Sequence, residues 1–319
     1  MPDRKKLVVA FAPFWHNGNR ITDRSLQIIL AALPAALFGV YRFGTPALGV
    51  LALAVSSAVL WELAFNRVAK RPVSVGDGTA AVIGLLFGMM LPATLPWWAV
   101  VTGTFLAIVV ARQIYGGVGA NTFNPTAVAV AILMLAWKQR MDVDAALVNY
   151  AFDFPAAFPL AAVKAFGNSA VKDLSLMDLF LGRQVGGIGT IGGAALLAGG
   201  VYLVLRGVIR WEIPVSFLAG MAVTAGIFHA SDPARFAPPA FHLLTGFSLF
   251  GAFFLATEDS SSPVNFIPML IYGAAVGSIA VLIRNIGVFA EGLVFAVLVG
   301  NLIQPLLDKI RPKALGKVG

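Results

Sequence analysis

Residues 45–65 read TPALGVLALAVSSAVLWELAF, and Glu62 is their only charged residue. The apolar core of a bilayer is about 30 Å thick and is crossed by about 20 apolar residues in a helix. A second run, 97–111, contains no charged residue. The strands of a membrane β-barrel would instead alternate between apolar and polar residues. These stretches therefore predict an all-α integral membrane protein.

The composition of the whole chain excludes an ordinary soluble domain. Of its 319 residues, 59% are apolar and 12% are charged, whereas soluble domains contain roughly 25% charged residues. Cysteine is absent, which excludes iron–sulfur clusters held by thiolates of this chain. We attribute the net charge of +8 to lysines and arginines that flank membrane spans. We therefore expect the lipid bilayer to be a partner and nucleic acid not to be one.

The apolar pattern predicts about ten transmembrane helices in two halves. The first five are expected at 26–43, 45–65, 78–92, 97–115 and 124–137, and the second five at 187–205, 213–230, 241–257, 265–283 and 288–307. This gives a cytoplasmic segment (1–25), a five-helix repeat (26–137), an extracytoplasmic loop (138–186), a second five-helix repeat (187–307) and a cytoplasmic tail (308–319).

The distribution of cationic residues predicts the orientation. Cytoplasmic loops of membrane proteins are enriched in lysine and arginine. If both termini are cytoplasmic, that side receives all but eight of the 23 Lys and Arg residues, with Arg112 among them. We therefore expect a multi-pass protein of the bacterial or archaeal inner membrane, with both termini in the cytoplasm.

The third span of each half is short, and the two halves share a sequence pattern. Residues 78–91 would form a helix of only about 21 Å. Leu-Phe-Gly at 86–88 recurs at 249–251, and Arg112 has a counterpart in Arg284. With five spans each, the halves would have opposite orientations, and short segments at matching positions indicate broken helices with a ligand site at their ends. The alternative is a chance likeness between low-complexity apolar stretches.

The sharpest local motif is GGVGANTFNP at 116–125. Its glycines permit positive φ angles and a close approach of the backbone to a ligand. Asn124 and Pro125 suit a helix cap and the first helical position. Such a loop offers N–H groups and a positive helix end to an anion or a polarisable heterocycle. A tight re-entrant turn without a ligand fits the motif equally well.

Acidic residues near the spans are further candidates. In VGDGT at 75–79, Asp77 or Thr79 is predicted to cap a helix, and Asp77 is as readily an interfacial cap as a binding residue. A carboxylate at mid-bilayer is costly, so it indicates function by default. Glu62 lies near a helix end and is expected to reach Arg67 or water. Glu291, seven residues after an arginine, is the stronger functional candidate.

Taken together, several motifs resemble the RnfD/NqrB family. They are the glycine motif at 116–125, DGTA at 77–80, LPWW at 95–98, IPVSF at 213–217, FHLL at 241–244, GAFF at 251–254 and EG at 291–292. The short N-terminal region is more similar to RnfD than to NqrB. The resemblance implies a membrane subunit of a complex that pumps Na⁺ or H⁺ while passing electrons from ferredoxin to NAD. It also implies a riboflavin among the helices and partner subunits that carry iron–sulfur clusters and flavin.

The resemblance further implies an FMN joined through its phosphate to a threonine in a Ser-Gly-Ala-Thr-Pro-Leu motif of the outward loop. The corresponding residues here are PAAFPL at 155–160. Phe158 occupies the acceptor position, and a phenyl ring cannot form a phosphoester. We therefore expect no covalent FMN. Either FMN is held non-covalently or this step of the electron path is missing.

These observations lead to one interpretation and two alternatives. We expect a flavin-binding, electron-transferring subunit of an Rnf-type ion-translocating ferredoxin:NAD⁺ oxidoreductase complex, with non-covalent riboflavin or FMN. Candidate cofactor-binding residues are Gly117, Gly119, Asn121, Phe123, Asn124, Asp77 and Thr79, and candidate ion-pathway residues are Glu291 and Thr257. No residue is expected to be catalytic or to bind a metal. The alternatives are a small-solute channel or transporter on the same scaffold, and a flavin-free structural subunit.

The phenylalanine at position 158 predicts that denatured protein carries no flavin. After acid denaturation all flavin should appear in the supernatant, and the chain of 33.5 kDa should show no in-gel flavin fluorescence. Phe158→Thr alone should not restore attachment, because the preceding Ser-Gly-Ala is also missing. The matched gain-of-function variant changes 155–158 to Ser-Gly-Ala-Thr in the presence of the modifying transferase. A fluorescent wild-type band would contradict this prediction.

Overall fold

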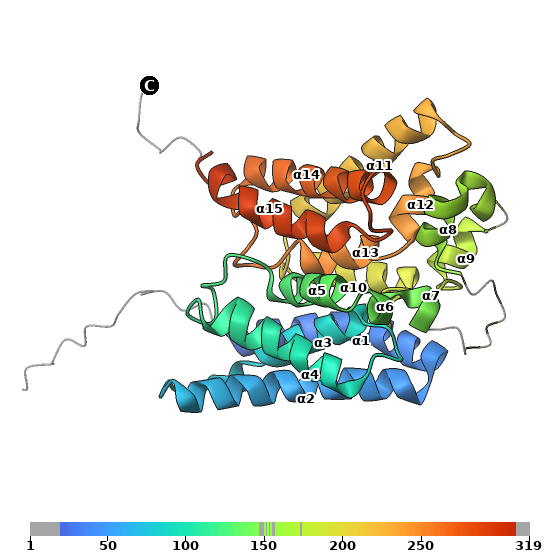
Figure 1. Cartoon of the computed structure of the whole chain (residues 1–319). Coiled ribbons are helices and arrows are strands. Elements are labelled where there is room, and N and C mark those ends of the chain that lie inside the picture. Colours follow the sequence, from blue (N-terminus) through green and yellow to red (C-terminus); the bar gives the residue numbers. More distant parts are fainter. Residues whose placement is uncertain are drawn as a thin grey trace, which may run out of the picture.

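The computed structural model describes residues 20–146, 150, 152, 154, 157–172 and 174–310. Within them the protein is helical and contains no β-strand (Figure 1). The first half comprises α1 (Ile21–Phe43), α2 (Thr45–Val68), η1 (Val75–Asp77), α3 (Thr79–Met90), α4 (Trp97–Phe105), the π-helical η2 (Leu106–Gln113) and α5 (Pro125–Ala136). The connecting region holds α6 (Lys138–Met141), α7 (Val143–Ala146), α8 (Pro159–Phe166), η3 (Asn168–Val171) and α9 (Leu176–Phe180). The second half comprises α10 (Gly193–Leu205), α11 (Glu212–Ser231), α12 (Pro239–Leu244), α13 (Ser248–Phe250), the π-helical η4 (Gly251–Leu255), α14 (Phe266–Asn285) and α15 (Leu293–Leu307).

The predicted all-α membrane fold is confirmed. Among the described residues, α1, α2, α11 and α14 are long and apolar enough to cross a membrane. Five shorter apolar helices coincide with further predicted spans: α3, α4 with η2, α5, α10 and α15. The remaining predicted span, the eighth (241–257), is a broken helix made of α12, α13 and η4. The third span is thus short in one half and interrupted in the other.

The two halves are packed in the same way. In the first half α2 packs against α3 and α4, and in the second half α11 packs against α12 and α14. The two halves contact each other through corresponding helices: α1 packs against α10, and α5 packs against α15. Figure 1 shows the start of α1 and the end of α15 at one end of the bundle, and α6 to α9 at the other. This arrangement has the form expected of two repeats with opposite orientations.

Small residues bring the long helices together. A Cβ atom added to Gly277 of α14 would lie 2.1 Å from the carbonyl oxygen of Phe217 in α11. Likewise, one added to Gly199 of α10 would lie 2.1 Å from the carbonyl oxygen of Ala31 in α1. In a bilayer, where lipid tails are as apolar as leucine, such close backbone packing is a main source of helix association.

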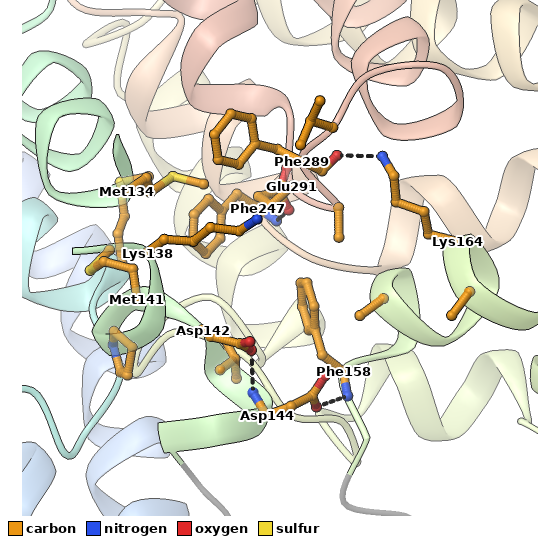
Figure 2. A pocket seen from close by; sticks show the side chains of 17 residues that line it. Met134, Lys138, Met141, Asp142, Asp144, Phe158, Lys164, Phe247, Phe289 and Glu291 are labelled. Atoms are coloured by element: carbon orange, nitrogen blue, oxygen red, sulfur yellow. Dashed lines mark hydrogen bonds between the residues drawn. The ribbon is translucent and has the colours of Figure 1, made fainter. Parts of the chain in front are cut away.

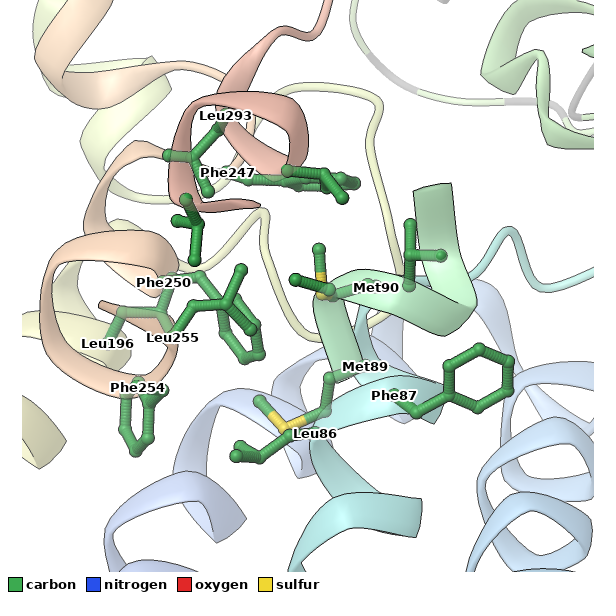
Figure 3. Packing of buried hydrophobic residues seen from close by; sticks show 14 of the residues in the cluster. Leu86, Phe87, Met89, Met90, Leu196, Phe247, Phe250, Phe254, Leu255 and Leu293 are labelled. Carbon is green, nitrogen blue, oxygen red and sulfur yellow. The ribbon is translucent and has the colours of Figure 1, made fainter. Parts of the chain in front are cut away.

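The centre of the bundle is apolar, and so is its outer surface. Figure 3 shows Met89 and Met90 of α3 on one side of the central cluster, facing Phe250 and Leu255 of the broken helix. Large apolar side chains on the long helices point outward, as expected where lipid surrounds the protein. They include Leu37, Leu60, Val223, Ile227 and Ile267.

The close contact at Gly277 generates a stability prediction. Gly277→Ala should lower the thermal unfolding midpoint in detergent, because the new methyl group meets a backbone oxygen that cannot move aside; overpacking of this kind costs about 1–3 kcal/mol. Gly49→Ala is the matched control, since a Cβ there has no atom within 4 Å. Folded protein would be measured by size-exclusion chromatography after heating. Equal midpoints for the two variants would contradict the proposed packing.

Candidate functional site

Two cavities lie at opposite ends of the bundle. Cavity A, of about 340 Å³, is lined by α1, α3, α5, α10, η2, η4 and the loops at 118–121 and 257–260. Cavity B, of about 330 Å³, is lined by α3, α5, α6, α7 and α8 and by residues 288–291. Thr79 at the start of α3 and Thr257 after η4 line cavity A. Met90 at the end of α3 and Phe247 at the break of the other short span line cavity B. Each cavity therefore touches both third spans: cavity A at the start of α3 and the end of η4, and cavity B at the end of α3 and the break before α13.

The structure gathers some of the predicted site residues around cavity A. Thr79, Gly119, Asn121 and Asn124 line it, together with the predicted ion-pathway residue Thr257. The other predicted cofactor-binding residues, Gly117, Phe123 and Asp77, are not on its lining. The second predicted ion-pathway residue, Glu291, lines cavity B.

The glycine loop has the predicted backbone but fewer available N–H groups than expected. Gly116, Gly117 and Gly119 have φ angles of 133°, 101° and 83°, which favour glycine. However, Gly116 N–H donates to the Gln113 carbonyl oxygen and Gly117 N–H to that of Arg112. These two groups close the end of η2 instead of facing a ligand.

Asn124 joins three elements. Its Oδ1 accepts from the N–H of Ala127 at 3.0 Å, so the predicted cap of α5 is confirmed. Its Nδ2 donates to the Leu255 carbonyl oxygen at 2.9 Å, and its own N–H donates to Oδ1 of Asn301 at 3.0 Å. Both ends of the side-chain amide are thus engaged within the protein. Asn124 positions the loop, and any contact with a ligand would compete with these bonds.

Asn121 presents an acceptor to cavity A. Its Nδ2 donates to the Phe123 carbonyl oxygen at 3.1 Å and to Oε1 of Glu258 at 3.2 Å. Its Oδ1 has no partner among the described residues, and the residue is only 4% exposed. The two bonds fix the amide plane and leave Oδ1 able to accept from an N–H donor.

Asp77 and Thr79 connect to a buried arginine. Oδ1 of Asp77 accepts from the N–H of Thr79 at 2.8 Å and from its hydroxyl at 2.6 Å. The cap position of α3 is Gly78, so the prediction that Asp77 or Thr79 occupies it is wrong. The Thr79 hydroxyl oxygen also accepts from Nη2 of Arg112. Arg112 is 2% exposed, so the expectation that it is a cytoplasmic loop cation is wrong. It lies in η2 and faces the interior.

Glu62 is the charge partner of Arg112. Its Oε1 lies 3.3 Å from Nη1 of Arg112 and also accepts from Ser74 Oγ at 3.0 Å and Gln113 Nε2 at 3.1 Å. Glu62 is fully buried. The expectation that it reaches Arg67 or water is therefore wrong. A carboxylate inside a membrane bundle needs a partner within the protein, and η2 supplies one.

Cavity B contains Phe158. Figure 2 shows its ring entering the cavity from the start of α8. Phe158 is 6% exposed and packs in an apolar cluster with Leu160, Val163 and Phe241. Its N–H donates to Oδ1 of Asp144 at 2.6 Å. Phe158, which stands in the position of the FMN-acceptor threonine, is therefore a packed side chain that fills part of cavity B. Residues 155 and 156 lie outside the described residues.

Glu291 closes the other side of cavity B. Oε1 and Oε2 lie 3.0 and 3.1 Å from Nη2 of Arg284, the arginine seven residues before it in the sequence. The carboxylate also accepts from the N–H groups of Phe247 at 2.8 Å and Leu293 at 3.1 Å. The four bonds join the break in the third span to α14 and to the start of α15.

Burial shifts the pKa of two groups in the connecting region. Desolvation raises the pKa of the Asp144 carboxyl above its usual value, although the Phe158 N–H partly opposes this. Desolvation also lowers the pKa of Lys164. Its Nζ donates to the carbonyl oxygens of Arg284 at 3.0 Å and Phe289 at 2.9 Å. These bonds hold the ammonium group between α8 and α14.

The sequence model of the NQR2, RnfD, RnfE family matches residues 8–316. The chain belongs to this family. It is 33% identical to a protein of Pectobacterium carotovorum named as the D subunit of an ion-translocating oxidoreductase complex, over 97% of this chain and 98% of the relative. It is 36% identical to the protein of Acetobacterium woodii named as the D subunit of a Na⁺-translocating ferredoxin:NAD⁺ oxidoreductase complex, over 95% and 93%. It is 33% identical to the protein of Clostridium ljungdahlii named as the D subunit of a proton-translocating ferredoxin:NAD⁺ oxidoreductase complex, over 89% and 88%.

Sequence reasoning missed one structural residue of this family member. Asn301 in α15 is fully buried and accepts from the Asn124 N–H through Oδ1. Its Nδ2 donates to the Ser261 carbonyl oxygen at 2.9 Å and to the Tyr272 hydroxyl at 3.0 Å. A single asparagine in the apolar run 293–307 is the signal that could have identified it, because a polar group there requires an internal partner.

The buried ion pair generates a second stability prediction. Arg112→Met leaves Glu62 as an unpaired buried charge and should cost about 3–5 kcal/mol. The double variant Glu62→Leu with Arg112→Met should recover most of this loss, because paired apolar replacement is often near neutral. Arg183→Met is the matched control, since Arg183 and Asp178 are exposed and such pairs contribute about 0–1 kcal/mol. Thermal midpoints would be measured in detergent, and equal losses for the single and double variants would contradict the pairing.

Proposed function

We propose that this protein is the D subunit of an Rnf-type ion-translocating ferredoxin:NAD⁺ oxidoreductase complex, and that it binds flavin without a covalent bond and passes electrons through it. Its family and the names of its relatives support the complex. A chain without cysteine requires partner subunits that carry the iron–sulfur clusters and receive electrons from ferredoxin. The relatives include one named for Na⁺ and one for protons, so the proposal covers either ion.

Cavity A is the proposed flavin site. Its volume of about 340 Å³ falls within the usual range of small-molecule sites, about 300–1,000 Å³. Phe253 and Phe254 on its wall contribute aromatic surface that could contact a planar ring. The unpartnered Oδ1 of Asn121 offers an acceptor to a ring N–H. This combination of an apolar slot with a fixed polar group is the observation that carries the proposal.

The charges around cavity A favour riboflavin over FMN at this site. Both arginines on the lining are already paired, Arg112 with Glu62 and Arg24 with Asp259. A phosphate would find no uncompensated cation there and would meet the carboxylate of Glu258. If FMN is also bound, cavity B is the alternative site, because Lys138 and Lys164 line it; the carboxylates of Asp142, Asp144 and Glu291 line it too, and Glu291 is paired with Arg284. Bound flavin would supply the redox chemistry, and the chain would supply position and electrostatics.

Ion movement is proposed to involve both cavities in turn. Thr257 lines cavity A and its hydroxyl donates to the Phe253 carbonyl oxygen at 2.7 Å. Glu291 lines cavity B, on the other side of the apolar cluster. We propose that the end of the bundle with the start of α1 and the end of α15 faces the cytoplasm, and that α6 to α9 face outward. The lysine and arginine distribution supports this orientation.

A visible absorbance spectrum tests the proposal against the two alternatives, because a solute channel and a structural subunit would both lack flavin absorbance. Val82→Phe should fill cavity A and reduce flavin per protein to less than about a fifth of wild type, since an added ring occupies much of a slot of this size. Val288→Phe changes a residue at the exposed rim of cavity B and should leave that flavin in place.

Stoichiometry would be measured from absorbance after extraction from protein that elutes as a folded peak. Loss of flavin only in Val288→Phe would place the cofactor in cavity B. A colourless wild-type protein, purified within its complex, would exclude flavin binding.

A further inference from the structure

A third and smaller cavity lies outside the proposed flavin sites. Cavity C, of about 40 Å³, lies between α8, α12 and α14. Its polar lining residues are Lys164, Arg235, His242, Arg284 and Asn285. Leu160, Val163 and Phe236 complete the wall. Arg235 and Lys164 are exposed, so this cavity is reached from the surface at the end of the bundle where α8 lies.

Several buried nitrogen atoms around cavity C have no hydrogen-bond partner among the described residues. They are Nε of Arg284, Nδ2 of Asn285 and both ring nitrogens of His242. His242 is 1% exposed and Arg284 is 3% exposed. The guanidinium and the amide group act only as donors at these atoms, and a neutral imidazole adds one N–H. A buried donor without an acceptor costs roughly 1–3 kcal/mol.

The charges on the lining are all positive. Lys164, Arg235 and Arg284 line cavity C, and no carboxylate does. Glu291 compensates the charge of Arg284 by accepting from its Nη2, although Glu291 itself does not line cavity C. Lys164 donates only to two backbone carbonyl oxygens, which neutralise no charge. Lys164 and Arg235 are exposed, so the uncompensated positive charge lies where cavity C opens to the surface and would attract an anion from solution.

We propose that cavity C is a binding site for one small monovalent inorganic anion, such as chloride. An anion would accept hydrogen bonds from Nε of Arg284 and Nδ2 of Asn285 and would offset the charge of Lys164. Water would satisfy the donors but not the charge. A volume of about 40 Å³ holds two or three waters, which is too small for a phosphate or sulfate group with its contacts.

The site has a consequence for Glu291. Nη1 of Arg284 donates to the His242 carbonyl oxygen at 3.0 Å and to Ser248 Oγ at 2.9 Å, while Nη2 holds Glu291. The proposed anion would accept a hydrogen bond from Nε, the remaining donor atom of Arg284. All sides of the guanidinium are then fixed, and the bound anion stabilises the broken third span through Arg284.

A thermal titration of the full-length chain in detergent tests this site. At constant ionic strength, replacing gluconate by chloride or bromide should raise the unfolding midpoint with the logarithm of anion concentration, because a ligand that binds only the folded state stabilises it. Sulfate should give no such rise. Asn285→Leu removes a donor without a protein partner and should raise the half-saturating chloride concentration at least tenfold.

Two further variants and one direct measurement complete the design. Lys164→Met should weaken the chloride response to a similar extent, whereas Lys172→Met, an exposed lysine after η3, should leave it unchanged. For the wild-type protein, the ³⁵Cl NMR signal should broaden relative to a detergent blank and narrow when bromide is added. Equal midpoints in chloride and gluconate, an unbroadened ³⁵Cl signal, or an unaltered response in Asn285→Leu would each overturn the proposal.

Discussion

A guanidinium group inside a membrane bundle is stable only when the protein itself supplies its counter-charge and acceptors, and each half of this chain contains one. Arg112 and Arg284 occupy corresponding positions at the end of the fourth span. The first is paired with Glu62 from α2, and the second with Glu291 from the loop before α15. Each half thus supplies a carboxylate to its buried arginine, but from a different element: a helix in the first half and a loop in the second. The ion pairs at the two ends of the bundle therefore have different neighbours.

The short third spans depend on these pairs. Thr79, at the start of α3, is held by Arg112. Phe247, at the break between α12 and α13, is held by Glu291. The adjacent Gly246 has a φ angle of 64°, and a Cβ atom there would lie 2.0 Å from Oε2 of Glu291. The break therefore requires glycine, both for its backbone conformation and for the space that the carboxylate occupies.

Two halves with opposite orientations would account for cavities at opposite ends. Short spans leave unfilled volume beyond their ends, and in an inverted pair these ends face opposite sides of the membrane. Thr257 and Glu291 consequently line different cavities, with the cluster around Phe250 between them. In cavity B, Phe158 adds apolar bulk. Cavity A keeps a fixed amide and two phenylalanines on its wall, which is why we assign the flavin to it.

The sequence by itself determined the helical membrane fold, the short third spans, the positive φ angles of the glycine loop and the Asn124 cap. These features are local, because hydropathy, backbone preference and helix spacing act within about 20 residues. Only the tertiary structure decided that Arg112 pairs with Glu62, that Asn301 fixes the loop, and which predicted residues share a cavity. Those contacts join residues up to 177 positions apart. Their partners are chosen by how the helices pack, because a buried polar group takes whichever partner packing brings within reach, and no local pattern encodes that choice.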